Sequence, residues 1–350
     1  MEKKGKVTLE ELADRINISR TTIYKILNNK GKVSEETRRK VLDAVRKYNY
    51  VPNLAAKNLA LNRQYEIAFC GYNNPRTPYT LNNLIKGIRW AADELSDYGL
   101  SVTYSLTDYT EHEKQISEIY RLAEAGVDAF AIYPNRVEPM GKCIDELIGM
   151  GRKVFTINKD VPFSDRNSYV GCNYYQSGIL AAEVLARMVP PGNEIAVLLG
   201  GEGVEYQDVT DRYRGLLKKM ERFPEVTLIE PFVMRADATE ALRQYVEELI
   251  TGNRKLGGIL DITYELDLIG SIVHRHNNSV RLVGFDLCDT IRNNMINHSI
   301  DAVIFQDMIA QGYQGIKSLF QALMDDTAGY IQMPKTKLDV VYEGNLEFFI

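Results

Sequence analysis

The first sixty residues contain three short segments in which apolar positions recur at helical spacing. Thr8 opens the first segment with a capping-box pattern, Ser19 caps a second that runs through Leu27, and Ser34 caps a third that runs to Tyr48. About three residues separate the first two segments, a spacing that is typical of a helix-turn-helix. Short solvated helices with ordinary surface charges are the alternative, and the pattern of these segments alone does not decide between the two.

From residue 64 onward, short apolar runs alternate with amphipathic stretches. The runs predict strands at 66–70, 101–106, 129–133, 153–157, 195–199, 226–229, 256–260, 282–285 and 302–305, and the stretches between them predict helices. A repeated strand–helix pattern is typical of parallel sheets with helices on both faces. Two such sets of about 130 residues therefore predict an α/β body made of two doubly wound lobes.

The net charge of −5 is divided unevenly along the 350 residues. Residues 1–64 hold 15 Lys and Arg and 7 Asp and Glu, a charge of +8, whereas the remainder holds 27 and 40, a charge of −13. A basic segment on an acidic body is typical of a nucleic-acid-binding module, and a solvated basic tail is the alternative. In the second predicted helix, Arg20, Thr21 and Lys25 face outward, as do side chains that contact base edges in the major groove.

A short segment of small and apolar residues, 53–60, follows Pro52. It is too short to be a stable helix alone in water, so we expect it to fold against a partner. In combination these features resemble the lactose-repressor (LacI) family of bacterial regulators. The resemblance rests on Val7-Thr8-Leu9, Leu12-Ala13, Ser19, Thr22, Asn28, Val33-Ser34, Thr37-Arg38, Val41, Asn49-Tyr50-Val51-Pro52-Asn53 and Leu59-Ala60. Ile16-Asn17 departs from the small Ala-Gly pair often found in the turn.

The resemblance implies a helix-turn-helix headpiece over residues 1–51 and a hinge helix over 52–63. As part of a homodimer, the two would bind a palindromic operator DNA. Leu59 matches the family's leucine that inserts into the minor groove, where an inserted side chain kinks the duplex. The implied DNA-binding residues are Thr8, Ser19, Arg20, Thr21, Thr22, Tyr24, Lys25, Asn28, Ser34, Asn53, Ala56 and Leu59.

Polar side chains follow several of the predicted strands of the body. Parallel sheets of this kind bind ligands beyond the carboxyl ends of their strands. The candidate effector-binding residues are Asn73, Asn74, Tyr79, Asn158, Lys159, Arg212, Tyr264, Asp286 and Gln306. Carboxylates, amides and bases in one place suit a small polyhydroxylated ligand. For each residue the alternative is a turn former or a helix cap.

The body also resembles periplasmic sugar-binding proteins and the LacI-family effector domain. This resemblance implies an N-terminal lobe of residues 64–172 and 305–330 and a C-terminal lobe of residues 173–304 and 331–350. It carries ligand-binding roles over to Asp286 in the Gly-Phe-Asp strand end, to Arg212 in the Arg-x-x-Gly helix and to the strand-end Gln306.

Two strand ends depart from the sugar-binding pattern. Asn158-Lys159 stands where an Asp-Arg pair is common, and Thr263-Tyr264 stands in place of Asn-Asp. These departures argue against a plain ribose-like or galactose-like set of contacts. A modified sugar, or a different kind of effector, is therefore the interpretation that the sequence leaves open.

Other signals narrow the class of protein. The four cysteines form no CxxC pair and lie in or beside apolar runs, which indicates buried thiols in a reducing cytoplasm. The N-terminus has no apolar signal region and no stretch is long enough for a membrane span. The four histidines lack zinc-ligand spacing, and no nucleophile-elbow or Walker motif is present, so we expect no metal, no cofactor and no enzymatic activity.

These observations predict a dimeric, ligand-gated transcriptional regulator, most simply a repressor of sugar-related genes. Its operator affinity would depend on a small carbohydrate or carbohydrate derivative bound between the lobes. Two alternatives come from other classes of protein. One is a cytoplasmic solute-binding module whose basic head contacts another protein, and the other is an enzyme that acts on a sugar or nucleotide.

Overall fold

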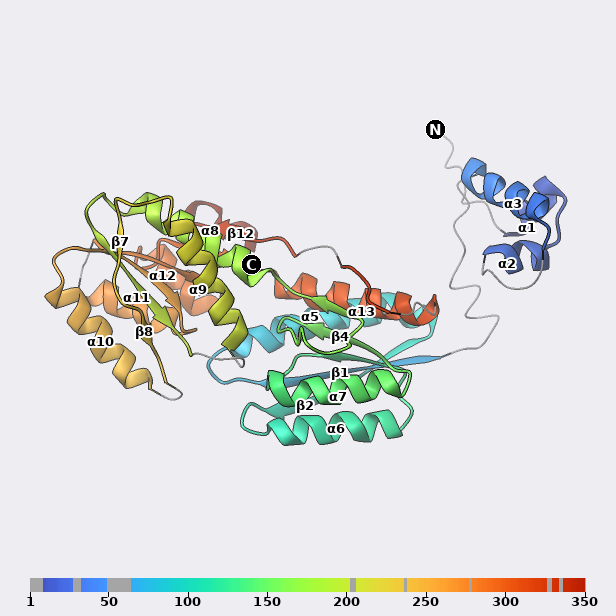
Figure 1. Ribbon diagram of the computed structural model, residues 1–350, viewed down its shortest axis with the longest axis horizontal. Coiled ribbons are helices and arrows are strands. Elements are labelled where there is room, and N and C mark those ends of the chain that lie inside the picture. The colour runs from blue at the N-terminus through green and yellow to red at the C-terminus, as the bar shows by residue number, and fades with distance from the viewer. Residues whose placement is uncertain are drawn as a thin grey trace. The chain divides into compact units, whose positions relative to one another are not determined.

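The computed structural model describes residues 9–27, 33–48, 64–201, 206–235, 238–276, 279–325, 329–333 and 336–349 (Figure 1). The chain divides into two compact units, one made mainly of residues 1–64 and one that holds most of residues 65–350. The predicted hinge helix over 52–63 lies outside the described residues. In the described ranges, no helix is both long enough and apolar enough to cross a membrane.

The headpiece unit contains three helices, α1 (Leu9–Ile16), α2 (Arg20–Leu27) and α3 (Glu35–Tyr48). Their buried faces form one small core, made of Leu12, Ala13, Ile16, Ile23, Ile26, Val41 and Ala44. Asn17 joins α1 to the next segment with a φ of 50°, a left-handed conformation that asparagine tolerates better than most residues. The predicted succession of helices is thus present in the headpiece.

The N-terminal lobe is built on a five-stranded sheet in the order β2-β1-β3-β4-β5, and every pairing in it is parallel. Its elements are β1 (Tyr65–Asn73), α5 (Pro78–Leu95), η1 (Ser96–Tyr98), β2 (Leu100–Asp108), α6 (His112–Glu124), β3 (Ala129–Ile132), α7 (Val137–Gly149), β4 (Lys153–Ile157) and β5 (Ser168–Val170). Helices α6 and α7 pack on one face of the sheet, and α5 and α13 (Met308–Met324) cover the other (Figure 1).

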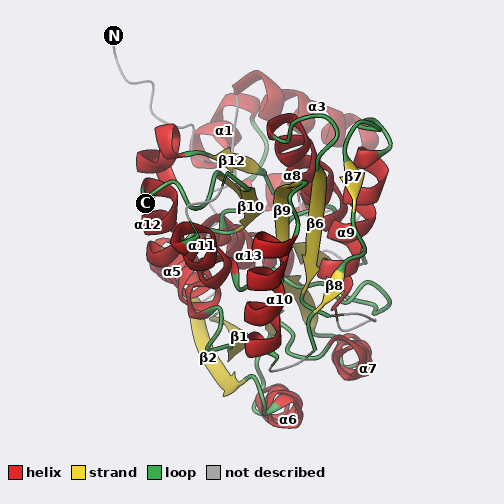
Figure 2. Cartoon of the chain, turned by 90° about the vertical axis from the view of Figure 1, so that its left-hand side faces the viewer, coloured by secondary structure: helices red, strands yellow, loops and turns green. Residues whose placement is uncertain are grey.

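The C-terminal lobe contains a second sheet in the order β12-β11-β10-β9-β6-β7, with β8 also paired to β6. Its elements are α8 (Tyr174–Met188), β6 (Glu194–Leu199), α9 (Gln207–Met220), β7 (Thr227–Leu228), β8 (Phe232–Val233), α10 (Thr239–Gly252), β9 (Leu256–Ile262), α11 (Leu266–Arg275), β10 (Arg281–Phe285), α12 (Asp289–Ile296), β11 (Ala302–Phe305), β12 (Asp339–Val341) and η3 (Glu343–Phe349). One core joins the sheet to α10, α11 and α12, and another joins it to α8 and α9 (Figure 2).

The two-lobe α/β architecture predicted from the sequence is confirmed, with differences at the sheet edges. The strand expected at 226–229 is shortened to β7, and the chain pairs with β6 again as β8. The second sheet is not wholly parallel, because β12 pairs with β11 in the antiparallel direction. Strands β5, β8 and β12 have only two or three residues each, too few for a periodic apolar pattern to develop.

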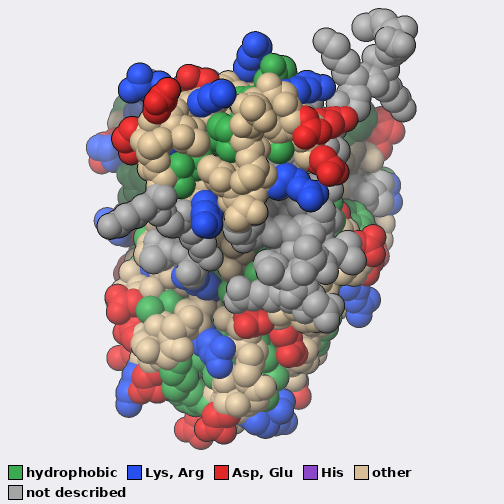
Figure 3. All heavy atoms as spheres, turned by 90° about the vertical axis from the view of Figure 1, so that its right-hand side faces the viewer, with side chains coloured by type: hydrophobic (Ala, Val, Ile, Leu, Met, Phe, Trp, Pro, Cys, Tyr) green, Lys and Arg blue, Asp and Glu red, His purple; other side chains and the backbone are tan. Residues whose placement is uncertain are grey.

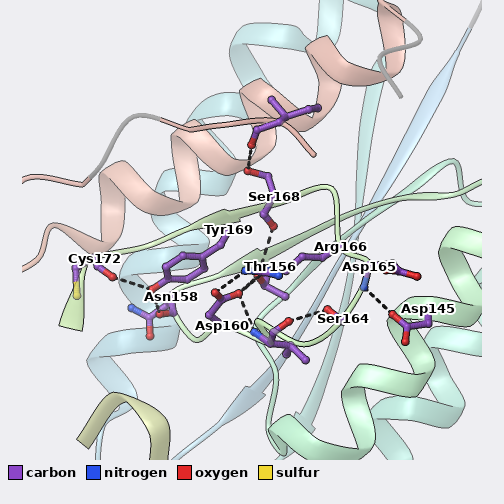
Figure 4. Close-up of polar contacts among 12 residues, drawn as sticks. Asp145, Thr156, Asn158, Asp160, Ser164, Asp165, Arg166, Ser168, Tyr169 and Cys172 are labelled. Carbon is purple, nitrogen blue, oxygen red and sulfur yellow. Dashed lines mark hydrogen bonds and ion pairs between the residues drawn. The ribbon is translucent and has the colours of Figure 1, made fainter. Parts of the chain in front are cut away.

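The chain passes between the lobes at the ends of β5, β11 and α13, and polar contacts tie these connections together. The Asn158 amide donates to Gln311 Oε1 at 3.1 Å, and Gln311 Nε2 donates to the Gln306 carbonyl at 2.5 Å. In the neighbouring segment, the single Tyr169 hydroxyl proton is shared between the Asn158 carbonyl oxygen at 2.9 Å and the Cys172 carbonyl oxygen at 3.1 Å (Figure 4). These bonds fix the strand ends from which the cleft between the lobes is built.

Candidate ligand-binding cleft and headpiece surface

A cavity of about 250 Å³ lies between the two lobes, at the carboxyl ends of their strands. The N-terminal lobe contributes Tyr72, Asn74, Arg76, Thr77, Thr80, Tyr109, Tyr133, Asn135, Arg136, Asn158 and Lys159. The C-terminal lobe and the connection into α13 contribute Tyr174, Gly200, Tyr206, Asp208, Arg212, Thr263, Tyr264, Asp286, Gln306 and Met308. This is the position in which parallel α/β sheets bind small ligands.

The cavity brings together most of the side chains proposed for the effector. Those that line it are Asn74, Asn158, Lys159, Arg212, Tyr264, Asp286 and Gln306. Asn73 and Tyr79 are not among its lining residues. Asn73 is exposed at the end of β1, where its carbonyl accepts from the Tyr109 amide at 3.0 Å, and Tyr79 lies in the first turn of α5.

Arg212 is the largest fully buried side chain in the described part of the chain, with an exposed fraction of 1%. It reaches the cavity from α9, which approaches α8 closely at Gly178: a Cβ there would lie 1.9 Å from the Arg212 carbonyl oxygen. The guanidinium carbon lies 4.0 Å from the ring centre of Phe285 and 5.0 Å from that of Tyr174. Its Nε and Nη1 atoms have no hydrogen-bond partner among the described residues, so the cavity contains a buried cation with free donors.

Asp286 and Gln306 face the same cavity from the ends of β10 and β11. Asp286 has an exposed fraction of 3% and a φ of 67°, and its Oδ1 accepts from Gln306 Nε2 at 2.8 Å. Burial raises the pKa of Asp286, while Arg212 and the bond from Gln306 act in the opposite direction. Gln306 Oε1 is buried without a partner among the described residues. Free donors and a free acceptor at one wall match ligand hydroxyl groups, which both donate and accept.

Tyrosine rings form much of the remaining lining. Tyr72 and Tyr133 stack with ring centres 4.5 Å apart and an interplanar angle of 22°. The Tyr264 hydroxyl donates to an Asp208 carboxylate oxygen, and burial, followed by the Asp208 charge, raises the pKa of Tyr264. Burial likewise raises the pKa of Tyr133 and Tyr174, so these phenols stay protonated. Flat apolar faces next to polar groups suit the ring of a carbohydrate.

Two predicted residues use their side chains for the protein's own structure. The Asn74 Oδ1 accepts from the Arg76 amide at 3.1 Å, which makes Asn74 a turn former at the cavity edge. The side-chain amide of Asn158 donates to Gln311. Because Gln311 in turn donates to the Gln306 carbonyl, Asn158 helps to position the connection between the lobes. Lys159 differs from both, because its Nζ has a long contact of 3.5 Å to the Asn135 carbonyl.

The cavity also has lining residues that the sequence did not single out. Among them are Tyr72, Tyr109, Tyr133 and Asn135, which lie at or just after strand ends, and Tyr174 and Asp208, which lie in the first turns of α8 and α9. Tyr133 ends the run predicted as strand 129–133, so a search of every strand end for aromatic residues would have found it. Asn135 is positioned by Gln115, a buried residue of α6 whose Oε1 accepts from the backbone N–H of Asn135 at 3.0 Å. No local pattern in the sequence predicts that contact.

Asp261, at the end of β9, is a buried carboxylate next to the cavity. Its Oδ1 accepts from the Thr263 amide at 2.9 Å and from the Thr263 hydroxyl at 2.6 Å. Burial raises the pKa of Asp261 to about 7, although both bonds from Thr263 oppose that shift. The folded protein therefore binds this proton more tightly than the unfolded chain, in which an aspartate titrates near its ordinary value of about 3.9.

An Asp261→Asn variant is expected to gain stability relative to the original protein as the pH rises. Between the unfolded and folded pKa values, folded Asp261 retains a proton that the unfolded chain has lost, so its contribution to stability falls toward pH 7. The asparagine keeps an acceptor for Thr263 and does not titrate. The gain should increase by at most roughly 1.4 kcal/mol per pH unit. Urea denaturation at pH 5, 6 and 8 measures it, and an equal difference at all three values would contradict the assignment.

Five of the described headpiece residues predicted to contact DNA fall into two groups. Arg20, Thr21 and Lys25 are exposed on α2, and an Arg20 Nη1 lies 3.4 Å from Glu10 Oε1. Ser19 and Ser34 act as helix caps, because Ser19 Oγ accepts from the Thr22 amide at 3.1 Å and Ser34 Oγ accepts from the Thr37 amide at 3.3 Å. Thr8, Asn28, Asn53, Ala56 and Leu59 lie outside the described residues, as does the side chain of Tyr24.

Charged side chains of both signs are interspersed on the face drawn in Figure 3. The described part of the headpiece nevertheless has cations on each helix, including Arg15 on α1, Lys25 on α2 and Arg46 on α3.

In the described ranges, no group of three His, Cys, Asp or Glu side chains is placed to hold a metal ion.

Each of the two units of the chain matches a known protein family. The family model described as "Bacterial regulatory proteins, lacI family" matches residues 8–53, and the model described as "Periplasmic binding protein domain" matches residues 68–327. A helix-turn-helix domain is therefore joined to a periplasmic binding protein domain. Over most of its length the chain belongs to the periplasmic binding protein domain family, and its first domain is a LacI-family DNA-binding domain.

Individual relatives support the same assignment at low identity. The chain is 35% identical over 98 residues to the probable HTH-type transcriptional repressor ExuR of Bacillus subtilis (strain 168), which covers 27% of this chain and 29% of that protein. It is 24% identical over 249 residues to the HTH-type transcriptional regulator MalR of Staphylococcus xylosus, covering 70% and 69%. Both relatives are named as regulators of transcription rather than as enzymes.

The fold of the body is shared with a solved sugar-binding protein of a sugar ABC transporter from Bacillus halodurans. The TM-score is 0.72 at 19% identity, and the match covers 81% of this chain and all of that one. At this identity, the likeness concerns the fold. It confirms the two-lobe arrangement in which the cavity lies.

Proposed function

We propose that the protein is a dimeric, cytoplasmic repressor that binds palindromic operator DNA through its headpiece and the segment 52–63. In this proposal, a small carbohydrate or carbohydrate derivative bound between the lobes controls the affinity for the operator. The observation that carries the proposal is buried Arg212, whose unpartnered donors face a cavity shared with Asp286 and Gln306. Buried donors without partners are costly unless a ligand satisfies them.

The position of the cavity supports the coupling between effector and DNA. Its lining comes from both lobes, so a ligand that contacts both walls binds one relative arrangement of the lobes better than another. A ligand shifts a conformational equilibrium by its difference in affinity for the two states. By reciprocity, operator DNA must change the affinity for the effector by the same factor.

Operator binding by the full-length protein is expected to weaken steeply as the salt concentration rises. Each phosphate neutralised by Lys or Arg releases counterions, so a protein with 6–10 phosphate contacts loses about 10³–10⁵ in affinity between 50 and 200 mM salt. Selection from random duplexes followed by fluorescence anisotropy at several salt concentrations measures the slope. If the basic head instead contacts another protein, no DNA sequence should be enriched in the selection and the affinity should show no such salt dependence. Sedimentation of the complex with DNA would give its stoichiometry.

A further inference from the structure

The two walls of the cavity carry different charges. The described lining residues of the N-terminal lobe include Arg76, Arg136 and Lys159, and no carboxylate is among them. On the C-terminal lobe, the described lining residues include one cation, Arg212, and two carboxylates, Asp208 and Asp286. A ligand in this cavity therefore meets a cationic wall on one side and a mixed wall on the other.

Of the three cations on the N-terminal wall, Arg76 is already neutralised. Its Nε lies 3.6 Å from Glu265 Oε1, at the start of α11 across the cavity. Arg136 is exposed at the start of α7. Lys159 is half buried, and within the described ranges no carboxylate lies at ion-pair distance from its ammonium group. Its long contact with the Asn135 carbonyl leaves the charge of Lys159 uncompensated.

The nearest carboxylate in sequence, Asp160, is occupied elsewhere. Arg166 Nε lies 2.6 Å from Asp160 Oδ1, and Arg166 Nη2 donates to Asp160 Oδ2 at 2.7 Å (Figure 4). The same carboxylate accepts from the Thr156 hydroxyl at 2.9 Å and from the Val161 amide at 2.7 Å. Asp160 is thus bound within the loop after β4. Lys159 lines the cavity, and Asp160 does not form an ion pair with it.

We propose that the effector is a polyhydroxylated anion whose acidic group, a carboxylate or a phosphate, is bound by Lys159 and Arg136. This inference rests on the proposed function and deepens it by naming the class of ligand. The hydroxyl groups of the ligand would contact Arg212, Asp286 and Gln306 on the opposite wall. Each wall then meets the part of the ligand that complements its charge.

Electrostatics gives the acidic group a specific effect on affinity. A half-buried ammonium attracts an anion more strongly than a fully hydrated one does, because less water screens the pair. The hydroxyl groups of a neutral sugar can accept hydrogen bonds from Lys159, but they carry no charge to offset the partial desolvation of its ammonium group, so a neutral sugar gains less than an anion does. The cavity should therefore prefer the acidic form of a sugar over its neutral form.

Calorimetric titration of the full-length protein tests this preference with matched ligands. The panel presents glucose, galactose and mannose, each as the neutral sugar, as the uronate and as the 6-phosphate. The expected result is an affinity at least tenfold higher for an acidic member than for its neutral counterpart. The uronate and phosphate arms distinguish the two sources of negative charge.

Lys159→Met removes the charge and keeps the length of the side chain. It is expected to lower the affinity for the acidic ligand at least tenfold and to bring the ratio of acidic to neutral binding close to one. Lys142→Met is the matched control, because Lys142 is exposed on α7 and pairs at the surface with Glu146 at 3.7 Å. Its binding should equal that of the original protein.

Each outcome decides between the two proposals. Equal or tighter binding of the neutral member in every pair overturns the anionic class and leaves a carbohydrate-controlled regulator. A Lys159→Met protein that keeps the original ratio overturns the role of Lys159. Binding of no member overturns both the anionic class and the carbohydrate effector, while the salt-dependent DNA binding measured separately still tests the regulator itself.

Discussion

Arg212→Met is expected to lower the affinity for the effector by two orders of magnitude or more, with operator binding by the free protein unchanged. Arg212 has unpartnered donors in the cavity, and hydrogen bonds to a charged group contribute about 1.5–3 kcal/mol each. Loss of the two bonds from Nε and Nη1 should therefore lower the affinity for the effector by more than about 100-fold. Isothermal titration measures the affinity, and anisotropy with labelled operator measures DNA binding.

The stability of the variant separates a binding role from a structural one. Methionine keeps an apolar contact with the ring of Phe285 and removes a buried charge whose donors are unsatisfied in the free protein. Among the described residues no carboxylate lies at ion-pair distance from Arg212, so the substitution breaks no salt bridge and removes the cost of burying an unpaired charge. We therefore expect the melting temperature of the ligand-free protein to stay within a few degrees, while the ligand-induced rise disappears.

Arg214→Met provides the control on the same helix. Arg214 is exposed, and its Nη1 lies 3.3 Å from Asp211 Oδ1 at the surface, away from the cavity lining. Its replacement should change neither affinity nor melting temperature. If Arg212→Met binds the effector as well as Arg214→Met does, the cavity is not the effector site.

Arg20→Ala should weaken operator binding by roughly 5-fold to 150-fold, the equivalent of about 1–3 kcal/mol for one well-placed base contact. Arg20 is the first residue of α2, exposed and placed where recognition helices contact bases. Its ion pair with Glu10 joins two exposed side chains, and such pairs contribute little to stability. The loss should therefore appear in DNA affinity, measured by anisotropy, and not in the melting temperature.

A base contact and a phosphate contact differ in their dependence on sequence. Arg20→Ala should reduce the preference for the selected operator over random DNA, because arginine contacts to guanine carry sequence information. Arg39→Ala is the comparison, since Arg39 is exposed on α3 and outside the predicted DNA-binding set. Equal losses for both variants on operator and random DNA would reduce Arg20 to a general electrostatic role.

The sequence predicted the two-lobe body because central strands such as β3, β4 and β11 are short, mostly apolar runs that are buried along most of their length. The run 153–157 coincides with β4, and 302–305 coincides with β11. The antiparallel pairing of β12 could not be predicted in this way. It depends on a contact between Val303 and Val341, positions that lie far apart in the sequence.

The candidate cavity was predicted in part, and the reason lies in what strand-end residues do locally. Asn74 and Asn158 line the cavity, as their positions after strands suggested. Their side chains, however, are bound within the protein: Asn74 stabilises a turn, and Asn158 is bound to Gln311 near the connection between the lobes. The unpartnered state of Arg212 depends on burial and on the absence of neighbours within reach, which only the folded arrangement determines. The charge difference between the walls is likewise a property of the two lobes facing each other.

The left-handed backbone at the cavity also bears on how relatives of this protein should be compared. Asn158, Tyr264 and Asp286 line the cavity with φ values of 65°, 68° and 67°. Asparagine and aspartate adopt this conformation at lower cost than other residues with side chains. Asn or Asp at the first and third positions would therefore persist during evolution for conformational reasons, even in regulators that have acquired a different signal. Positions with ordinary φ values, such as Lys159, would change with the ligand and would be the better markers of a shared effector.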